Sequence, residues 1–160
     1  MILACTGHRP NKLGGFTIPN PIYNKICNQI KLFLEDKKPE KVLCGMALGF
    51  DFYFAAMAIK MKIPVIGVIP FKGQEALWSD IDKKRYDFLL KNCKETIIVS
   101  EGGFSNSKMH IRNHYLVDNS DMLLVCWDGS ASGTKSCLDY ALSKNKEINK
   151  DIFIINPNTL

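Results

Sequence analysis

The chain has 160 residues, of which 46% are hydrophobic, so it can bury one core without help from disulfides or metal. Its formal net charge of +5 comes almost wholly from lysines spread along predicted helices, and no basic run is interleaved with aromatic residues. We therefore expect a solvated surface and no nucleic-acid partner. No stretch approaches membrane-spanning length and no basic leader precedes the first apolar run, so we expect a cytoplasmic protein without a membrane partner.

Short apolar runs alternate with segments of helical periodicity along the whole chain. In chain order we predict a strand at 2–6, a helix at 22–37, a strand at 41–44, a helix at 50–61, a strand at 65–70, a helix at 80–90, a strand at 96–100, a helix at 107–117, a strand at 122–127, a helix at 134–144 and a strand at 152–155. Ile22, Ile26, Ile30 and Phe33 recur at helical spacing, and Pro39 ends that helix.

Strands separated by helices of this length pair in parallel through right-handed crossovers. The sequence therefore predicts an α/β fold, a doubly wound, three-layer Rossmann-like parallel sheet that forms a single domain over residues 1–160. The one long irregular segment covers residues 8–21, and its length predicts a lid or a binding loop rather than a simple connection.

Glycines and polar residues cluster directly after the predicted strands. The clusters are residues 6–10, 45–51, 71–74, 101–103 and 128–134. The carboxyl ends of parallel strands share one edge of the sheet, where loops and helix N-termini converge on ligands. This pattern predicts a site for a small, phosphorylated molecule.

Arginine is rare in this lysine-rich chain and occurs only as Arg9, Arg85 and Arg112. Arg9 follows the first strand and Arg112 lies near the start of the fourth helix, both at the predicted ligand edge. A planar guanidinium suits bidentate binding of phosphate or carboxylate, whereas a structural ion pair is the alternative for either residue. Arg85, in the middle of a helix, is interpreted as a surface residue.

Gly45 and Gly49 flank a strand-to-helix turn that can bring backbone N–H groups close to a phosphate. Asp51 lies just inside the following helix and either caps it or accepts a ribose hydroxyl. A second phosphate-type turn contains Asp128, Gly133 and Thr134, although a plain glycine-rich loop before a helix has the same composition.

Gln74 and Trp78 follow the third strand as an amide beside an indole. The ring can stack on a base while the amide reads a polar edge of that base. Alternatively, Trp78 is a hydrophobic staple at the start of the next helix.

Catalytic and metal signals are weak. His110 and His114 are four residues apart, but no Glu lies in the intervening zincin position, and no cysteine pair has the spacing of a zinc ribbon or redox motif. We therefore predict no metal and no cofactor, and we interpret the six cysteines as buried residues of a reducing compartment. Candidate catalytic carboxylates are Asp51 and Asp128.

Several motifs together resemble the YspA/YpsA-like family of the SLOG superfamily, which is Rossmann-like and related to LOG-type phosphoribohydrolases and the DprA core. They are Thr6-Gly7-His8-Arg9-Pro10, Gly45-Met46-Ala47-Leu48-Gly49-x-Asp51, Pro70-Phe71-x-Gly73-Gln74 with Trp78, Met109-x-x-Arg112-Asn113, and Gly133-Thr134. The resemblance implies binding of nucleotides or nucleotide-derived ligands, in some members as sensor domains. It implies contacts by Gly7, His8, Arg9, Gly45, Gly49, Asp51, Gln74, Trp78, Arg112, Asn113, Gly133 and Thr134.

One position departs from the related LOG-type enzymes, which cleave a base from a nucleoside monophosphate. Their Pro-Gly-Gly-x-Gly-Thr-x-x-Glu motif aligns with Gly133-Thr134, but Cys137 stands where the Glu belongs. Glycosidic hydrolysis needs a carboxylate, so this departure favours a binding or sensing module. A hydrolase or transferase acting on a nucleotide, with Asp51 or Asp128 substituting, remains the alternative, and a homo-oligomer is left open.

Overall fold

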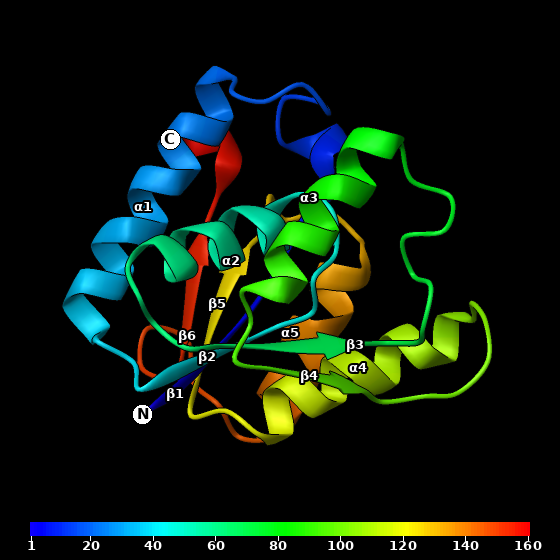
Figure 1. The fold of residues 1–160 in the computed structure, drawn as a ribbon. Helices are drawn as coiled ribbons and strands as arrows, with labels where there is room; N and C mark the ends of the chain where they lie inside the picture. The colour runs from blue at the N-terminus through cyan, green and yellow to red at the C-terminus, as the bar shows by residue number, and fades with distance from the viewer.

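The computed structural model describes residues 1–160 and shows a six-stranded, all-parallel sheet between two layers of helices (Figure 1). The elements are β1 (Ile2–Gly7), α1 (Pro21–Lys37), β2 (Lys41–Cys44), α2 (Phe50–Lys60), β3 (Val65–Ile69), α3 (Asp80–Lys91), β4 (Glu95–Ile98), α4 (Asn106–Asp118), β5 (Met122–Cys126), α5 (Gly133–Ser143) and β6 (Ile152–Ile155). The predicted α/β class and three-layer Rossmann-like architecture are confirmed, and the ends of the predicted elements shift by only one or two residues.

The strand order is β4-β3-β2-β1-β5-β6. The chain first builds outward from β1 to β4, then returns through α4 and places β5 on the other side of β1. Loops after β1 and β5 consequently lead to helices on opposite faces of the sheet. Such a switch point leaves a crevice at the carboxyl ends of the two strands, where open α/β sheets bind ligands.

Two apolar clusters fill the space between the layers. Side chains of α1, α2 and α3 pack on one face of the sheet, around Phe50, Phe54 and Ile30. Helices α4 and α5 cover the other face, around Leu116 and Leu138. Figure 1 shows the same division, with α1, α2 and α3 on one side of the strands and α4 and α5 on the other. Strands buried on both faces explain the continuously apolar runs in the sequence.

Side-chain caps fix the beginnings of four helices. Asn20, Ser79, Ser105 and Ser132 precede α1, α3, α4 and α5, and each side-chain oxygen accepts a hydrogen bond from a backbone N–H of the first turn. Helix α2 instead begins after Gly49, whose φ of 92° lies in the left-handed region. Residues next to each helix therefore fix where it begins at the ligand edge.

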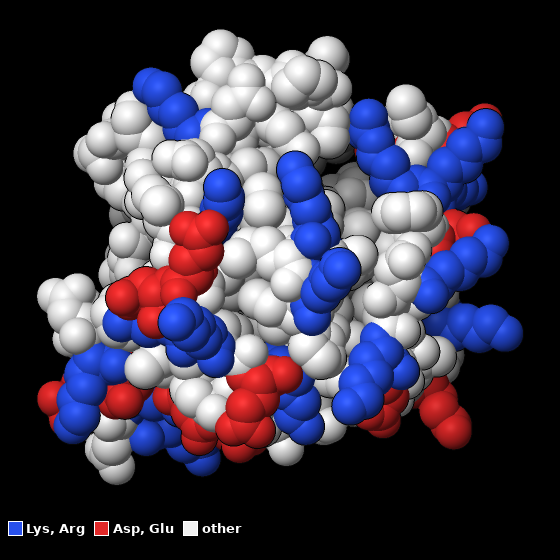
Figure 2. Space-filling view, turned by 60° about the vertical axis from the view of Figure 1, so that its left-hand side comes forward, with Lys and Arg blue, Asp and Glu red and all other residues white.

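No lysine side chain is buried, as the scattering of lysines along the predicted helices indicates. Figure 2 shows lysine and arginine side chains separated by uncharged ones across the middle of one face, with acidic side chains among them at its lower part. None of the helices is both long and apolar enough to span a bilayer.

Candidate functional site

Two cavities adjoin one another at the carboxyl edge of the sheet. The first, here called the polar lobe, has a volume of about 430 Å³ and is lined by Thr6, Gly7, Arg9, Ala47, Asp51, Phe104, Asn106, Met109, His110, Arg112, Asn113, Gly133 and Ser136. The second, the apolar lobe, has a volume of about 530 Å³ and is lined by Arg9, Phe71, Lys72, Gly73, Gln74, Ala76, Leu77, Trp78, Gly103, Phe104 and Met109. Arg9, Phe104 and Met109 line both, so the two lobes form one cleft.

The polar lobe lies at the switch point between β1 and β5. Its walls come from the end of β1, the turn before α2, the inner face of α4 and the first turn of α5. Asn106 and Gly133 are the first residues of α4 and α5, so both helix N-termini meet at this cavity. The positive ends of two helix dipoles, together with two arginines, make the lobe favourable for an anion.

Arg112 is buried to 5% exposure although it carries a full charge. Its Nη1 donates to the carbonyl oxygen of Gly45 at 2.7 Å, and its Nε donates to Oδ1 of Asn113 at 2.9 Å. Neither partner is a carboxylate, so the structural ion pair considered from the sequence is not what holds this side chain. Two neutral acceptors leave the buried positive charge without a counterion at hydrogen-bond distance.

Asp51 forms part of the floor of the polar lobe, and it does not cap α2. Its Oδ2 accepts a hydrogen bond of 3.1 Å from the backbone nitrogen of Ala47, in the turn before the helix. Burial raises the pKa of the Asp51 carboxyl, while the charge of Arg112 opposes this rise. Acceptance of a ribose hydroxyl stays a prediction.

The two turn glycines have packing roles within the protein. A Cβ on Gly45 would lie 2.3 Å from Nη1 of Arg112, and one on Gly49 would lie 2.5 Å from the carbonyl oxygen of His8. Gly45 thus allows the guanidinium to approach the backbone, and Gly49 allows α2 to start against the loop after β1. Neither glycine lines the two lobes, and phosphate binding by their turn stays a prediction.

Gln74 and Trp78 both line the apolar lobe. Trp78 is half-buried and packs edge-on against Phe52 and Tyr86, at ring-centroid distances of 5.8 and 5.3 Å. Nε2 of Gln74 donates to the hydroxyl of Tyr86 at 3.2 Å and to the carbonyl oxygen of Gly45 at 3.3 Å. The indole of Trp78 therefore packs against the core and also lines the cavity. Because Nε2 of Gln74 is engaged within the protein, a base would have to be recognised by its Oε1 atom.

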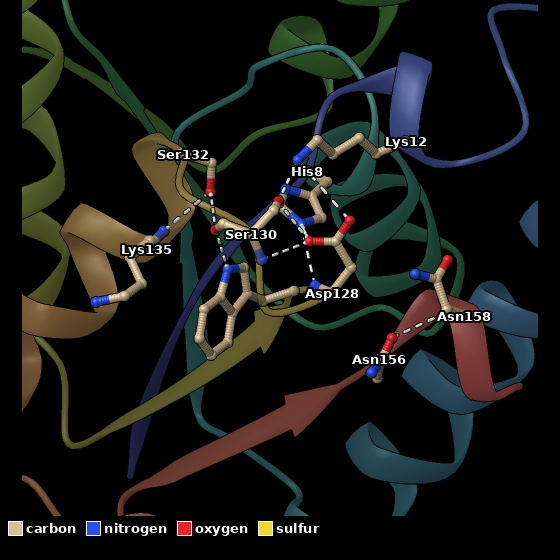
Figure 3. A network of polar contacts seen from close by, with 9 residues as sticks. His8, Lys12, Asp128, Ser130, Ser132, Lys135, Asn156 and Asn158 are labelled. Atoms are coloured by element: carbon tan, nitrogen blue, oxygen red, sulfur yellow. Dashed lines mark hydrogen bonds and ion pairs between the residues drawn. The ribbon is translucent and has the colours of Figure 1, made fainter.

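A separate polar network joins the loops after β1 and β5 (Figure 3). Nε2 of His8 lies 2.8 Å from Oδ1 of Asp128, and the Ser130 hydroxyl donates to that same oxygen at 2.5 Å. Lys12 contacts the Ser130 hydroxyl. Hydrogen bonds from Ser130, followed by the contact with His8, hold the pKa of Asp128 well below its usual range.

This network lies outside both lobes and fixes the loop that leads into α5. Within the segment from His8 to Pro21, only Arg9 lines the cleft, while Leu13 is fully buried and Lys12 is held by the network. The lid expected there stays untested, but its first residues are anchored to the body of the protein.

The structure brings eight of the predicted ligand residues to the cleft. Gly7, Arg9, Asp51, Arg112, Asn113 and Gly133 line the polar lobe, and Arg9, Gln74 and Trp78 line the apolar lobe. His8, Gly45, Gly49, Asp128 and Thr134 line neither lobe. Of these, Thr134 is a buried residue of the first turn of α5.

The sequence predicted Arg112 and Asn113 of α4 as ligand residues, but Asn106, Met109 and His110 of the same helix were missed. Asn106, Met109, His110 and Asn113 all line the polar lobe, and their spacing of three, four and seven residues places them on one helical face. This spacing could have revealed the face from the sequence. The face is mostly polar, however, and helical faces were searched for as apolar stripes. Phe104, 70% exposed at the junction of the lobes, carries no comparable sequence signal.

Comparisons with known proteins identify the family and the fold of the chain. The model of the YspA SLOG family matches residues 3–160. The SPbeta prophage-derived protein YoqJ of Bacillus subtilis (strain 168) is 33% identical over 142 residues, which cover 76% of this chain and 83% of that protein. The UPF0398 protein BH1768 of Halalkalibacterium halodurans is 27% identical over 169 residues, covering 99% of this chain and 89% of that protein.

Solved structures with a similar fold include the DNA processing protein A of Helicobacter pylori, described as binding single-stranded DNA. It has a TM-score of 0.67 and 16% identity, covering 99% of this chain and 70% of its own. The molybdenum cofactor binding protein of Rippkaea orientalis has a TM-score of 0.59 and 20% identity, covering 98% of this chain and 90% of its own. At these identities the likeness shows the fold. The family match over nearly all residues, with the 33% identical relative, confirms the resemblance of the motifs: the chain belongs to the YspA SLOG family.

Proposed function

We propose that the cleft binds a nucleotide or a nucleotide-derived phosphorylated ligand, with phosphate in the polar lobe and the base in the apolar lobe. The observation that carries this proposal is Arg112, a buried guanidinium beside a polar cavity with only neutral hydrogen-bond partners. A buried cation is costly without a counterion, and a phosphate at the starts of α4 and α5 would supply the charge. The free thiols of all six cysteines suit the reducing cytoplasm, where we place this activity.

The apolar lobe supports the choice of a base as the second part of the ligand. Trp78, Phe104 and Leu77 present apolar surface there, and Leu77 is 99% exposed. Covering an exposed leucine with a flat ring removes apolar surface from water, which is favourable. Stacking of a base on an aromatic ring adds about 1–3 kcal/mol of binding free energy. Arg9 lies between the lobes, where the sugar and the first phosphate of such a ligand would pass.

The size of the cleft favours a small molecule over a nucleic acid. Volumes of about 430 and 530 Å³ fall within the range of small-molecule sites. One neighbour is described as binding single-stranded DNA and another as binding a molybdenum cofactor, so the fold accommodates both kinds of ligand. The absence of a nucleic-acid partner stays a prediction for this chain.

Binding without turnover is favoured by the residue at the LOG-type Glu position. Cys137 is buried to 1% exposure, and burial raises the pKa of its thiol to about 11. A neutral thiol at pH 7 neither stabilises an oxocarbenium-like charge nor activates water.

Hydrolysis of a nucleotide is the second candidate because Asp51 lies on the floor of the polar lobe with a raised pKa. A carboxyl whose pKa is raised in a cleft is a general-acid candidate.

One experiment separates the two candidates. Protein purified gently from cells is analysed by native mass spectrometry, and apo protein is then incubated with a mixture of nucleotides while retained and released small molecules are identified. A retained, unchanged nucleotide supports binding. Free base or ribose phosphate that disappears with Asp51→Asn supports hydrolysis. A clean apo mass with no retained or altered nucleotide contradicts both.

A further inference from the structure

Two cysteines and a carboxylate meet beneath the floor of the polar lobe. Cys5 lies in the buried part of β1 and Cys44 ends β2, and the pairing of Ala4 with Leu43 makes these cysteines cross-strand neighbours. Asp51 enters from the first turn of α2. The two Sγ atoms and one carboxylate oxygen all lie within 4.8 Å of one another, and all three side chains are buried.

We propose that Cys5, Cys44 and Asp51 form a binding site for a thiophilic divalent cation, with Zn²⁺ as the best fit. Zn²⁺ takes thiolate and carboxylate ligands in tetrahedral geometry, at about 2.3 Å for sulfur and 2.1 Å for oxygen, which puts the ligand atoms about 3.6 Å apart. The distance from Sγ of Cys5 to Oδ1 of Asp51 is 3.9 Å. Closing the cluster around an ion therefore needs a shift of a few tenths of an ångström between Cys5 and Asp51, and no pair of ligand atoms starts more than 4.8 Å apart.

The surroundings of the cluster orient its ligands. The backbone N–H of Ala47 holds Oδ2 of Asp51 at 3.1 Å, which turns Oδ1 toward Cys5. The Cys44 thiol donates a hydrogen bond of 3.3 Å to the backbone oxygen of Asp51, and it would exchange this bond for the ion on binding as a thiolate. Carboxylate ligands of metals are held in this way by hydrogen bonds to their second oxygen.

Charge balance favours a divalent ion at this place. The carboxyl and both thiols are buried, where an uncompensated negative charge is costly, and a divalent cation would supply the opposing charge. Two thiolates and one carboxylate around Zn²⁺ would form a complex with a net charge of −1. The guanidinium of Arg112, whose charge acts on both Cys5 and Asp51, compensates that charge.

The fourth ligand position has a source in the cleft. Asp51 also lines the polar lobe, so a water molecule or an oxygen of the bound ligand entering the lobe can complete the tetrahedron. Three protein ligands with an open fourth position form the arrangement of a Zn²⁺ site that takes part in binding or chemistry. The three protein ligands are the same whichever ligand binds in the cleft.

Zinc-edge X-ray absorption on the full-length, zinc-loaded protein tests the ligand set without any substitution. We expect a shell of two sulfur atoms with oxygen completing the coordination. A shell of nitrogen and oxygen alone, or of three or more sulfurs, overturns the proposal. Failure of the unsubstituted protein to retain one equivalent of Zn²⁺ against a weak chelator overturns it as well.

Cobalt titration then assigns the residues. Co²⁺ should give the intense visible bands of a tetrahedral thiolate site, and Cys44→Ser or Asp51→Asn should lower the affinity at least tenfold. Cys93→Ser is the matched control, because this half-buried thiol follows α3 and lies outside the cluster. Bands that persist unchanged in Cys44→Ser, or that Cys93→Ser also removes, contradict the assignment. Nucleotide binding by metal-free protein is measured separately, so failure here leaves the proposed function untouched.

Discussion

Arg112 serves the folded protein and the proposed ligand at the same time. Arg112→Lys keeps the charge but removes the hydrogen bonds to Gly45 and Asn113, so we expect the free energy of unfolding to fall by about 1–3 kcal/mol. Binding of pyrophosphate or a nucleotide should weaken by a similar amount, measured by titration calorimetry below the melting temperature. Arg85→Lys is the control, since Arg85 pairs with Asp82 on α3 outside both lobes. Unchanged affinity in Arg112→Lys would mean that the phosphate lies elsewhere.

Gly45 sets the position of that guanidinium. In Gly45→Ala the new Cβ would meet Nη1 of Arg112 at 2.3 Å, so the side chain must move and the protein should lose roughly 1–3 kcal/mol of stability. Gly133→Ala has no atom within 4 Å of the added Cβ and should be nearly neutral. Urea unfolding of the two variants checks the contrast. Equal stability of both variants would show that the packing of Arg112 against the turn is loose.

The lowered pKa of Asp128 predicts how the free energy of unfolding depends on pH. Its pKa is lower in the folded protein than the value of about 3.9 in an unfolded chain, so the folded state binds fewer protons. The stabilisation is present above the unfolded pKa and is lost as pH falls below about 4. Between pH 7 and pH 3, the free energy of unfolding measured with urea should therefore fall less in Asp128→Asn than in the unsubstituted protein.

At the scale of single elements, the N-cap of α5 links local structure to binding. Ser132→Ala removes the hydrogen bond from the backbone N–H of Lys135, and Ser79→Ala removes the equivalent bond on α3. Both variants should lose about 1 kcal/mol of stability. Only Ser132→Ala should also weaken anion binding, because α5 begins at the polar lobe and α3 does not. Equal affinities in the two variants would separate the start of α5 from the site.

The secondary elements were predictable because local signals agree with the fold. Continuously apolar runs mark the buried strands, and the serine caps of α3, α4 and α5 lie at the starts of polar helices. The two ends of a strand depend on its hydrogen bonds to the neighbouring strand. For example, β4 is predicted at 96–100 but covers Glu95–Ile98, the residues that pair with β3. Pairing partners of this kind are not encoded in the strand itself.

At the scale of the whole molecule, the order of strands and helices predicts where the site lies but not how its side chains are arranged. Alternation of strands and helices places the carboxyl end of every strand on one edge, so Arg9, Asp51 and Arg112 were predicted to lie at that edge. Alternation does not say which way each side chain turns. The packing of Gly45 against Arg112 was not predicted, and phosphate binding by its turn stays a prediction. The buried proximity of Cys5 and Cys44 depends on strand order, which no spacing motif reveals.

The central claim is that one cleft takes both a phosphate and a base. The most direct test is the melting temperature of the protein with a panel of nucleotides, their parent nucleosides, and inorganic phosphate and pyrophosphate. At a hundredfold its dissociation constant, a ligand adds about 2.7 kcal/mol, which for a chain of this length raises the melting temperature by roughly 5–10 °C. We expect such a rise with a phosphorylated nucleotide and a clearly smaller one with its nucleoside or with phosphate alone. No rise with any nucleotide, or the same rise with phosphate alone, would contradict the account.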